Sequence, residues 1–279
     1  MSDWSSDVCS SDLEERNDMN VANNNKPMNI MDMHVENYAP LSDGGPSNQE
    51  KQYYPYSHIG CDETGSGDFF GPLCVVACYI DERDYDWLAS LNVRDPKLMT
   101  PQEVIEIARE IKDRLVYSLL ILDNSHYNQM AAAGNNLANI KAKLYNQAVT
   151  NVMQKVAMKV DKKVVNQFVS PKTYYNYLKS EVIVVKDLSF EQKGEEQYFA
   201  IMCSSILSKY AFYQYFNNMS KSLKVKLPRG NTSSVVDHVA VSIAKKYGKK
   251  MLLKVTKTNM TNYKRIKDEI GRASCRERV

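Results

Sequence analysis

Several features that define other protein classes are absent from this chain of 279 residues. No apolar run approaches the roughly 20 residues of a membrane-spanning helix, and the acidic, serine-rich start does not resemble a signal peptide. The six cysteines show no C-x-x-C spacing, which argues against a zinc site. No glycine-rich stretch fits a dinucleotide fingerprint or ends in the lysine of a P-loop. We therefore expect a cytoplasmic protein that does not bind membranes.

The two ends of the chain differ in character from the rest. Segments 1–13 and 269–279 resemble in-frame translations of sequencing adapters, and we interpret both as artefacts, with ordinary polar tails as the alternative. Segment 14–52 is asparagine-rich and has no apolar period, which predicts a linker left after a missing N-terminal domain. Segment 53–268 is then the folded domain. Its apolar content is enough for one sizeable core.

Hydrophobic periodicity predicts alternating strands and helices along this domain. Strands are expected before the glycine-rich turn 65–71 and at 73–80, 116–122, 163–168 and 182–185. Helices are expected at 84–91, after a capping box that begins at Thr100, and at 137–156, 171–179, 195–216 and 234–247. A basic segment with alternating apolar residues follows at 249–257. Strands separated by helices indicate a mixed α/β sheet with helices covering its faces.

The strongest chemical signal lies where the first strand meets the glycine-rich turn. Asp62 and Glu63 are adjacent there, and carboxylates in small number are typical ligands of Mg²⁺. The glycines that follow allow the backbone to approach a ligand closely. A solvated turn is the alternative interpretation. Because neighbouring strand residues point to opposite faces, we expect both acids to serve one site only if the strand ends or bulges at Glu63.

Residues 60–72, Gly-Cys-Asp-Glu-Thr-Gly-Ser-Gly-Asp-Phe-Phe-Gly-Pro, resemble the first signature of the type 2 ribonucleases H, specifically of ribonuclease HIII. Gly-Ser-Gly, in place of Gly-Arg-Gly or Gly-Lys-Gly, points away from the sister family ribonuclease HII. Further blocks resemble the family in the same order, and the likeness covers roughly residues 57–265. These blocks lie at 93–98, 141–148, 165–168, 193–195 with 200–210, 227–230 and 236–237.

The resemblance implies a ribonuclease H-like fold and an endonuclease that cleaves the RNA strand of RNA–DNA hybrids with two Mg²⁺ or Mn²⁺ ions. It also implies that the catalytic, metal-ligating positions are Asp62, Glu63, Asn166 and Glu195. Asn166 stands where the family has an Asp. An amide oxygen can coordinate a cation but brings no negative charge, so we expect this substitution to weaken catalysis.

The resemblance further implies how the substrate is held. The backbone of Thr64, Gly65, Ser66 and Gly67 would reach the 2′-hydroxyl, the group that distinguishes RNA from DNA. Contacts to nucleic acid are predicted for Lys97, Lys141, Asn146, Arg229 and Lys257, although each in isolation would ordinarily be a solvated side chain. Two further departures from the family lie beside these residues, Pro96 for the usual Ser and Tyr145 for the usual His.

Two other functions remain open from the sequence. One is a catalytically inactive RNA–DNA hybrid-binding protein with a degraded metal site. The other is a nuclease of the same fold that acts on DNA. The net charge of +3 fits a polyanionic partner in every case. We expect the protein to be a monomer.

Overall fold

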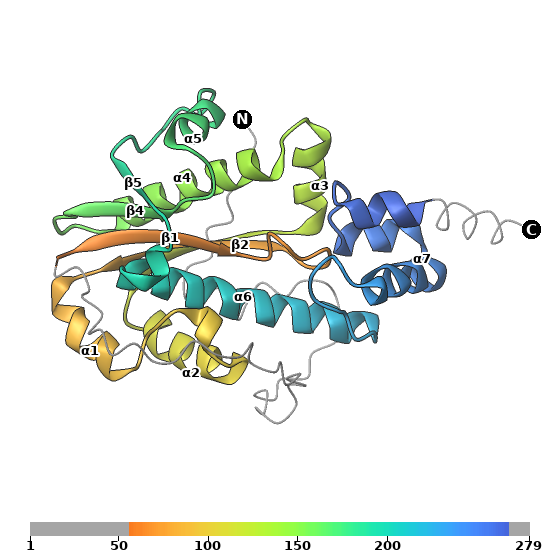
Figure 1. Cartoon of the computed structure of the whole chain (residues 1–279), viewed down its shortest axis with the longest axis horizontal. Coiled ribbons are helices and arrows are strands. Elements are labelled where there is room, and N and C mark those ends of the chain that lie inside the picture. Colours follow the sequence, from red (N-terminus) through yellow and green to blue (C-terminus); the bar gives the residue numbers. More distant parts are fainter. Residues whose placement is uncertain (1–55, 268–279) are drawn as a thin grey trace, which may run out of the picture.

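The computed structural model describes residues 56–267, so the predictions for segments 1–13, 14–52 and 269–279 lie outside the described residues. A five-stranded sheet forms the middle of the molecule (Figure 1). Its strands are β1 (His58–Thr64), β2 (Leu73–Ile80), β3 (Val116–Leu122), β4 (Lys162–Asn166) and β5 (Leu188–Glu191). The helices are α1 (Tyr85–Ser90), α2 (Pro101–Lys112), α3 (Asn124–Ala132), α4 (Leu137–Lys155), α5 (Pro171–Tyr177), α6 (Phe199–Leu223) and α7 (Ser234–Val255), with short 3₁₀ turns η2 (Glu82–Asp84), η3 (Pro96–Leu98) and η4 (Gly194–Glu196).

The sheet is mixed, as predicted. Its order is β3-β2-β1-β4-β5, with β1, β2 and β3 antiparallel and β4 and β5 parallel to β1. The strand β1 is central and pairs with β2 along its whole length. Its pairing with β4 stops at Cys61, which lies opposite Val165. The last part of β1 therefore has a neighbour on one side only.

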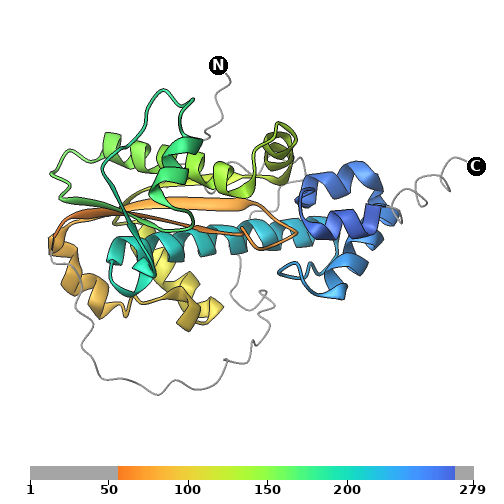
Figure 2. The same cartoon turned by 45° about the horizontal axis from the view of Figure 1, so that its top comes forward.

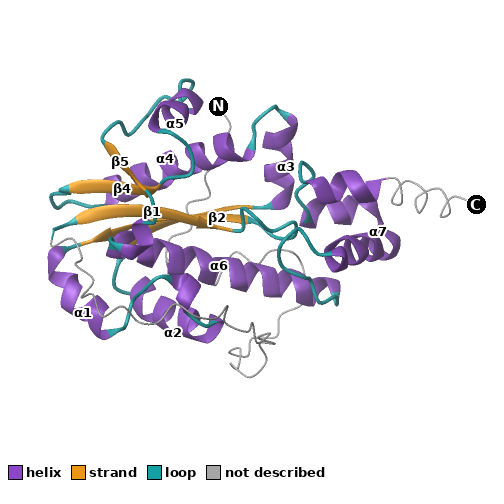
Figure 3. Cartoon of the chain, in the orientation of Figure 1, coloured by secondary structure: helices purple, strands orange, loops and turns teal. Residues whose placement is uncertain are grey.

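Helices cover both faces of this sheet, with α4 and α5 on one side and α1, α2 and α6 on the other (Figures 1 and 2). Successive side chains of β2 alternate between two cores: Val76 and Cys78 join the core on the α6 side, while Val75 and Ala77 join the core on the α4 side. This period of two, with every residue buried, explains why the sequence of β2 is continuously apolar. At one end of the sheet, α7 lies beside α3 (Figure 3).

The start of α6 packs directly on β1. A Cβ at Gly60 would lie 2.4 Å from the backbone nitrogen of Ile201, so only glycine permits this approach. The Ser204 hydroxyl donates to the carbonyl of Gly60 at 2.9 Å. His58 accepts a hydrogen bond at Nε2 from the amide of Ala200 at 3.2 Å, which satisfies one free amide in the first turn of α6. Burial lowers the pKa of His58 to about 4, so the imidazole is neutral.

Most predicted elements are confirmed, and two are wrong. Residues 182–185 do not form a strand: Val182 is 88% exposed, and the backbone at Ile183 and Val185 bonds to the side chain of Asn146 instead of a neighbouring strand. The edge strand is β5, three residues later. Residues 249–255 continue the helix α7 after a kink at Gly248, whose φ of 81° favours glycine. Within residues 56–267, no helix is both long and apolar enough to cross a membrane.

Candidate active site

The site lies where β4 diverges from β1. Contrary to the expectation that the strand ends or bulges at Glu63, β1 remains regular through Thr64, with Asp62 opposite Val76 and Glu63 opposite Val75. The two acids therefore leave the strand toward opposite faces. They still share one site, because β4 no longer covers this edge and the Tyr145 hydroxyl lies within hydrogen-bonding distance of both carboxylates, 3.4 Å from Asp62 Oδ1.

Asp62 faces α6 and is the acid with the least compensation. It is 9% exposed and accepts a hydrogen bond from Ser205. Burial, together with repulsion from Glu63 and Glu195, raises the pKa of Asp62 to about 7. The Lys97 ammonium attracts this carboxylate, but too weakly to offset its burial. The ionised form of Asp62 is thus disfavoured until positive charge is brought to it.

Glu63 faces α4, where it has two partners. Lys141 Nζ lies 2.5 Å from Glu63 Oε1, and the Tyr145 hydroxyl donates to Oε2. Lys141 is 8% exposed and its ammonium also lies 4.0 Å from the centre of the Phe168 ring. Burial and the two nearby carboxylates raise the pKa of Tyr145 well above its ordinary value, so it remains a hydrogen-bond donor. Lys141, predicted to contact nucleic acid, instead orients a site carboxylate.

Glu195 enters the site from η4. It is 4% exposed, and Lys97 Nζ lies 2.5 Å from Oε1 while Asn166 Nδ2 donates to Oε2 at 2.9 Å. Burial alone would raise the pKa of Glu195, but the hydrogen bonds, above all that from Lys97, outweigh it and the pKa lies below its usual range. The same contact raises the pKa of Lys97. Glu195 is therefore a stable carboxylate.

Asn166 ends β4 and is fully engaged by the protein. Its Oδ1 accepts from the amide of Gly194 at 3.2 Å, and its Nδ2 donates to Glu195. An aspartate here would retain the contact to Gly194 and place a second negative charge beside Glu195. Asn166 acts as a hydrogen-bond bridge between β4 and η4 in this arrangement.

The donor set agrees with a divalent cation only in part. Across residues 56–267, no group of three or more His, Cys, Asp or Glu side chains is gathered as ligands around one point. The buried Asp62, however, has hard carboxylate oxygens of the kind that Mg²⁺ and Mn²⁺ prefer. Glu63 and Glu195 have the same chemistry at its two sides. The three carboxylates fit such ions, and Asn166 as oriented does not.

The glycine loop, residues 65–72, connects β1 to β2 next to these acids. Gly65 has a φ of 98°, and a Cβ there would lie 2.3 Å from the carbonyl oxygen of Pro72, so this glycine is required by the fold. Gly67 is different, because it is exposed and a Cβ there would meet no atom within 4 Å. Thr64 Oγ1 is 2.9 Å from Ser208 Oγ and is turned inward. The open backbone is therefore at Ser66 and Gly67.

Of the five side chains predicted to contact nucleic acid, two are buried without an ion pair to any of residues 56–267, and three have acidic protein partners. Lys257 is fully buried and Asn146 is 5% exposed, so neither side chain reaches the surface. Arg229 forms a paired contact with Asp68, with Nε 2.8 Å from Oδ1. The Lys97 side chain is 74% exposed although it is bound to Glu195, so it alone of these combines exposure with a place at the site.

Sequence reasoning missed Ser205 and His58. Ser205 supports Asp62, and it lies in α6, a region that the sequence predicted only to be helical. His58 opens the buried part of β1 as a polar residue before Ile59 and Gly60, and that position was the available signal, since a buried imidazole needs partners. Tyr145 was noted only as a departure from the family.

Comparison with known proteins agrees with this geometry. The sequence model of the family described as "Ribonuclease HII" matches residues 59–263. The chain is 38% identical to ribonuclease HIII of Bacillus cereus (strain AH187) over 208 residues, which are 74% of this chain and 67% of that protein. It is 36% identical to ribonuclease HIII of Bacillus mycoides (strain KBAB4) over 231 residues, covering 80% and 74% of the two chains.

Solved structures give the same result. Bst-RNase HIII in complex with Mn²⁺ superimposes with a TM-score of 0.75 at 26% identity, over 83% of this chain and 77% of that one. Ribonuclease H2 from Pyrococcus horikoshii OT3 matches with a TM-score of 0.64 at 18% identity, over 77% and 98% of the two chains, and shows the fold alone. The ribonuclease H-like fold and the resemblance to ribonuclease HIII are thereby confirmed. The chain therefore belongs to the wider family that the description "Ribonuclease HII" covers, and within that family it is of the ribonuclease HIII type.

Proposed function

We propose that this protein is an endonuclease that cleaves the RNA strand of RNA–DNA hybrids in a reaction dependent on Mg²⁺ or Mn²⁺. Family membership supports the activity. The observation that carries the proposal is the buried Asp62, whose carboxylate lies beside Glu63 and Glu195 at an uncovered sheet edge and keeps a raised pKa. Burying a carboxylate beside two others lowers the stability of the fold. Binding of divalent cations, as a phosphodiesterase requires, would neutralise these charges.

The carboxylates of Asp62, Glu63 and Glu195 would hold the ions. When bound, the ions would activate water for attack and stabilise the leaving 3′-oxygen. Tyr145 and Lys141 orient Glu63, and Ser205 orients Asp62. Lys97 holds Glu195 and has an exposed ammonium that would meet a substrate phosphate. The RNA strand would be recognised through its 2′-hydroxyl by the backbone of Ser66 and Gly67.

The alternative of a hybrid-binding protein with little catalysis has one observation in its favour. Asn166 uses both ends of its amide within the protein and adds no charge to the site. The site would then hold one ion less firmly, while the substrate-binding surface would be unchanged. We also propose that residues 53–268 form the catalytic domain, which encloses the family match at 59–263.

The test uses one end-labelled RNA strand annealed to DNA, and a DNA duplex and an RNA duplex of the same sequence. We expect internal cleavage of the RNA in the hybrid, in the presence of Mg²⁺ or Mn²⁺ and not of a chelator. Glu195→Gln is the matched control for a contaminating nuclease. Tight hybrid binding without cleavage at any metal concentration would support the alternative, and equal cleavage of the DNA duplex would contradict the proposed substrate.

A further inference from the structure

Lys257, just after α7, has a buried ammonium group with no role in the proposed chemistry. The side chain is fully buried, and Nζ donates to the carbonyl oxygens of Asp68 at 2.9 Å, Gly71 at 2.5 Å and Pro72 at 3.4 Å. Those three carbonyls belong to the glycine loop. One ammonium has three protons, so a single side chain can satisfy all three acceptors.

The loop is fastened to the same segment through its backbone. The amide of Lys257 donates to the carbonyl of Phe69 at 2.9 Å, and the amide of Gly71 donates to Val255 at 3.2 Å. Phe70 and Thr256 form an isolated antiparallel bridge between these contacts. The second half of the loop is thus paired with a segment that is almost 190 residues away in sequence.

A second clamp holds the same part of the loop from the other side. The Asp68 carboxylate accepts two hydrogen bonds from Arg229 and one from the amide of Gly230 at 2.7 Å. The amide of Phe69 donates to the carbonyl of Gly230 at 3.0 Å. Asp68 is 7% exposed, so this clamp is also buried. Lys257 and the Asp68–Arg229 pair are thus two clamps on the second half of the loop. Within the described residues, the tip at Ser66 and Gly67 has no such contacts with the rest of the protein.

The energetic cost of Lys257 indicates that its contacts matter. Burial lowers the pKa of its ammonium to about 7, against an attraction to Asp68 that raises it. A methionine of similar length would fill the same space without that cost. It would also remove the ammonium donor from the carbonyls of Asp68 and Pro72, while Gly71 would keep only its bond from Asn124. The loop would then lose its fixed conformation.

We propose that Lys257, together with the Asp68–Arg229 clamp, is a positioning device that holds the glycine loop so that its tip selects a ribose-containing strand. The inference rests on the proposed function, because it assumes that the loop contacts the RNA strand. Its consequence is distinct: the anchors lie away from the acids and should govern the choice of substrate more than the chemical step.

The test is Lys257→Met, with Lys254→Met as matched control, because Lys254 is exposed on the same segment. Dissociation constants for a hybrid and a DNA duplex of the same sequence are measured without divalent metal, well below the melting temperature. We expect Lys257→Met to reduce the preference for the hybrid by about tenfold, with KM for the hybrid raised more than kcat is lowered, and Lys254→Met to match the parent protein. A merely structural role would lower the active fraction and leave both the preference and KM unchanged.

If Lys257→Met does not fold, Asp68→Asn serves as the test variant, because it weakens the second clamp with little change of shape. The same loss of preference in that folded variant supports the proposal. A preference within twofold of the parent protein, in whichever of the two variants folds, overturns it. Because binding preference is measured without turnover, a parent protein that never cleaves the hybrid would refute the proposed function and still leave this result readable.

Discussion

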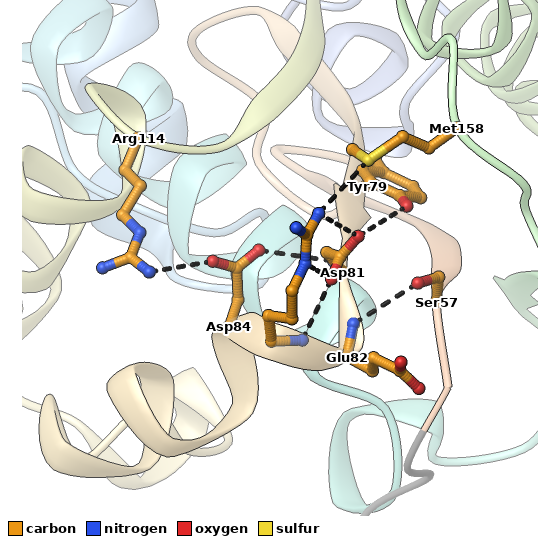
Figure 4. Close-up of polar contacts among 8 residues, drawn as sticks. Ser57, Tyr79, Asp81, Glu82, Asp84, Arg114 and Met158 are labelled. Carbon is orange, nitrogen blue, oxygen red and sulfur yellow. Dashed lines mark hydrogen bonds and ion pairs between the residues drawn. The ribbon is translucent and has the colours of Figure 1, made fainter.

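Two aspartates near the opposite ends of β1 have pKa values shifted in opposite directions. Beside the start of β1, Asp81 accepts hydrogen bonds from the backbone and guanidinium of Arg83 and from the Tyr79 hydroxyl (Figure 4). These contacts, first of all the Arg83 side chain, lower the pKa of Asp81 to about 2. Near the other end of the strand, burial and neighbouring carboxylates raise the pKa of Asp62 to about 7.

The opposite pKa shifts distinguish an aspartate that stabilises a turn, Asp81, from one at the candidate active site, Asp62. At the Asp81 corner both aspartates have an opposite charge as partner: Asp81 pairs with Arg83, and Asp84 pairs with Arg114 at 3.0 Å. The corner also caps the turn η2 through a capping box. Around Asp62 the carboxylates of Glu63 and Glu195 lie nearby, and residues 56–267 form no ion pair with Asp62. A folded chain retains such a cluster where a ligand provides the missing charge.

The largest expected effect comes from removing the uncompensated charge with Asp62→Asn. Hybrid cleavage should fall by about a thousandfold, because one strong electrostatic stabiliser of the reaction is lost. In chelator at pH 8, the free energy of unfolding should rise by about 2 kcal/mol, because an ordinary Asp has a pKa near 3.9 when unfolded. Activity assays and denaturant titrations of the two proteins measure both effects.

The sign of the pH dependence follows from the same shift. The folded state of the parent protein keeps the Asp62 proton between about pH 4 and pH 7, and the unfolded state releases it. This contribution to stability is present at low pH and is lost as the pH rises through 7. His58 acts in the opposite direction, because its pKa is lowered and its contribution is lost as the pH falls from 6.5 toward 4. The difference between parent and Asp62→Asn isolates the carboxylate. A constant difference from pH 4 to pH 8 would contradict the assignment.

The second-largest effect is expected when a negative charge is added beside Glu195. Asn166→Asp should raise metal-dependent hybrid cleavage by at least about a hundredfold, corresponding to roughly 2.7 kcal/mol of barrier. It should also tighten Mn²⁺ binding in calorimetry, because a fourth carboxylate joins three. Asn176→Asp, on α5, is the control for added charge alone. If the parent is already as fast as Asn166→Asp, residue 166 is not a ligand position.

A smaller effect is expected in the glycine loop from Gly67→Val. Cleavage of the hybrid should fall by about tenfold with the fold unchanged, because a side chain at this open position would block the backbone from the ribose. Gly65→Val should instead prevent folding, since its Cβ would collide with Pro72. Circular dichroism and cleavage rates measured together distinguish the two variants. Equal loss of structure and activity in Gly67→Val would make this glycine purely structural.

The smallest effect is expected at the compensated corner. Asp81→Ala removes a helix cap and should lower the free energy of unfolding by about 1 kcal/mol. Cleavage of the hybrid and its dependence on metal should remain as in the parent protein. Thermal denaturation and initial rates measure the two quantities. A loss of activity in the folded variant would show that the two ends of β1 are coupled.

Particular residues show how far the sequence alone leads. The apolar run of β2, the capping box at Thr100 and the buried strand β3 were predictable, because each is specified by its own period or cap. The wrong strand at 182–185 has a tertiary cause, since Asn146 offers its backbone a better partner than a strand would. Lys257 was misplaced for a similar reason: a lysine in a basic segment is ordinarily exposed, and only folding places its ammonium among loop carbonyls.

The sequence by itself determined most of the elements and the family, and it singled out the candidate acids, because periodicity and motif spacing are local properties of the chain. Tertiary structure alone decided the charge state of those acids. Asp62 and Asp81 are the same residue type, yet the pKa of one is raised and that of the other lowered. The reason is physical: ionisation depends on burial and on charges brought near by folding, and distance along the chain does not contain that information.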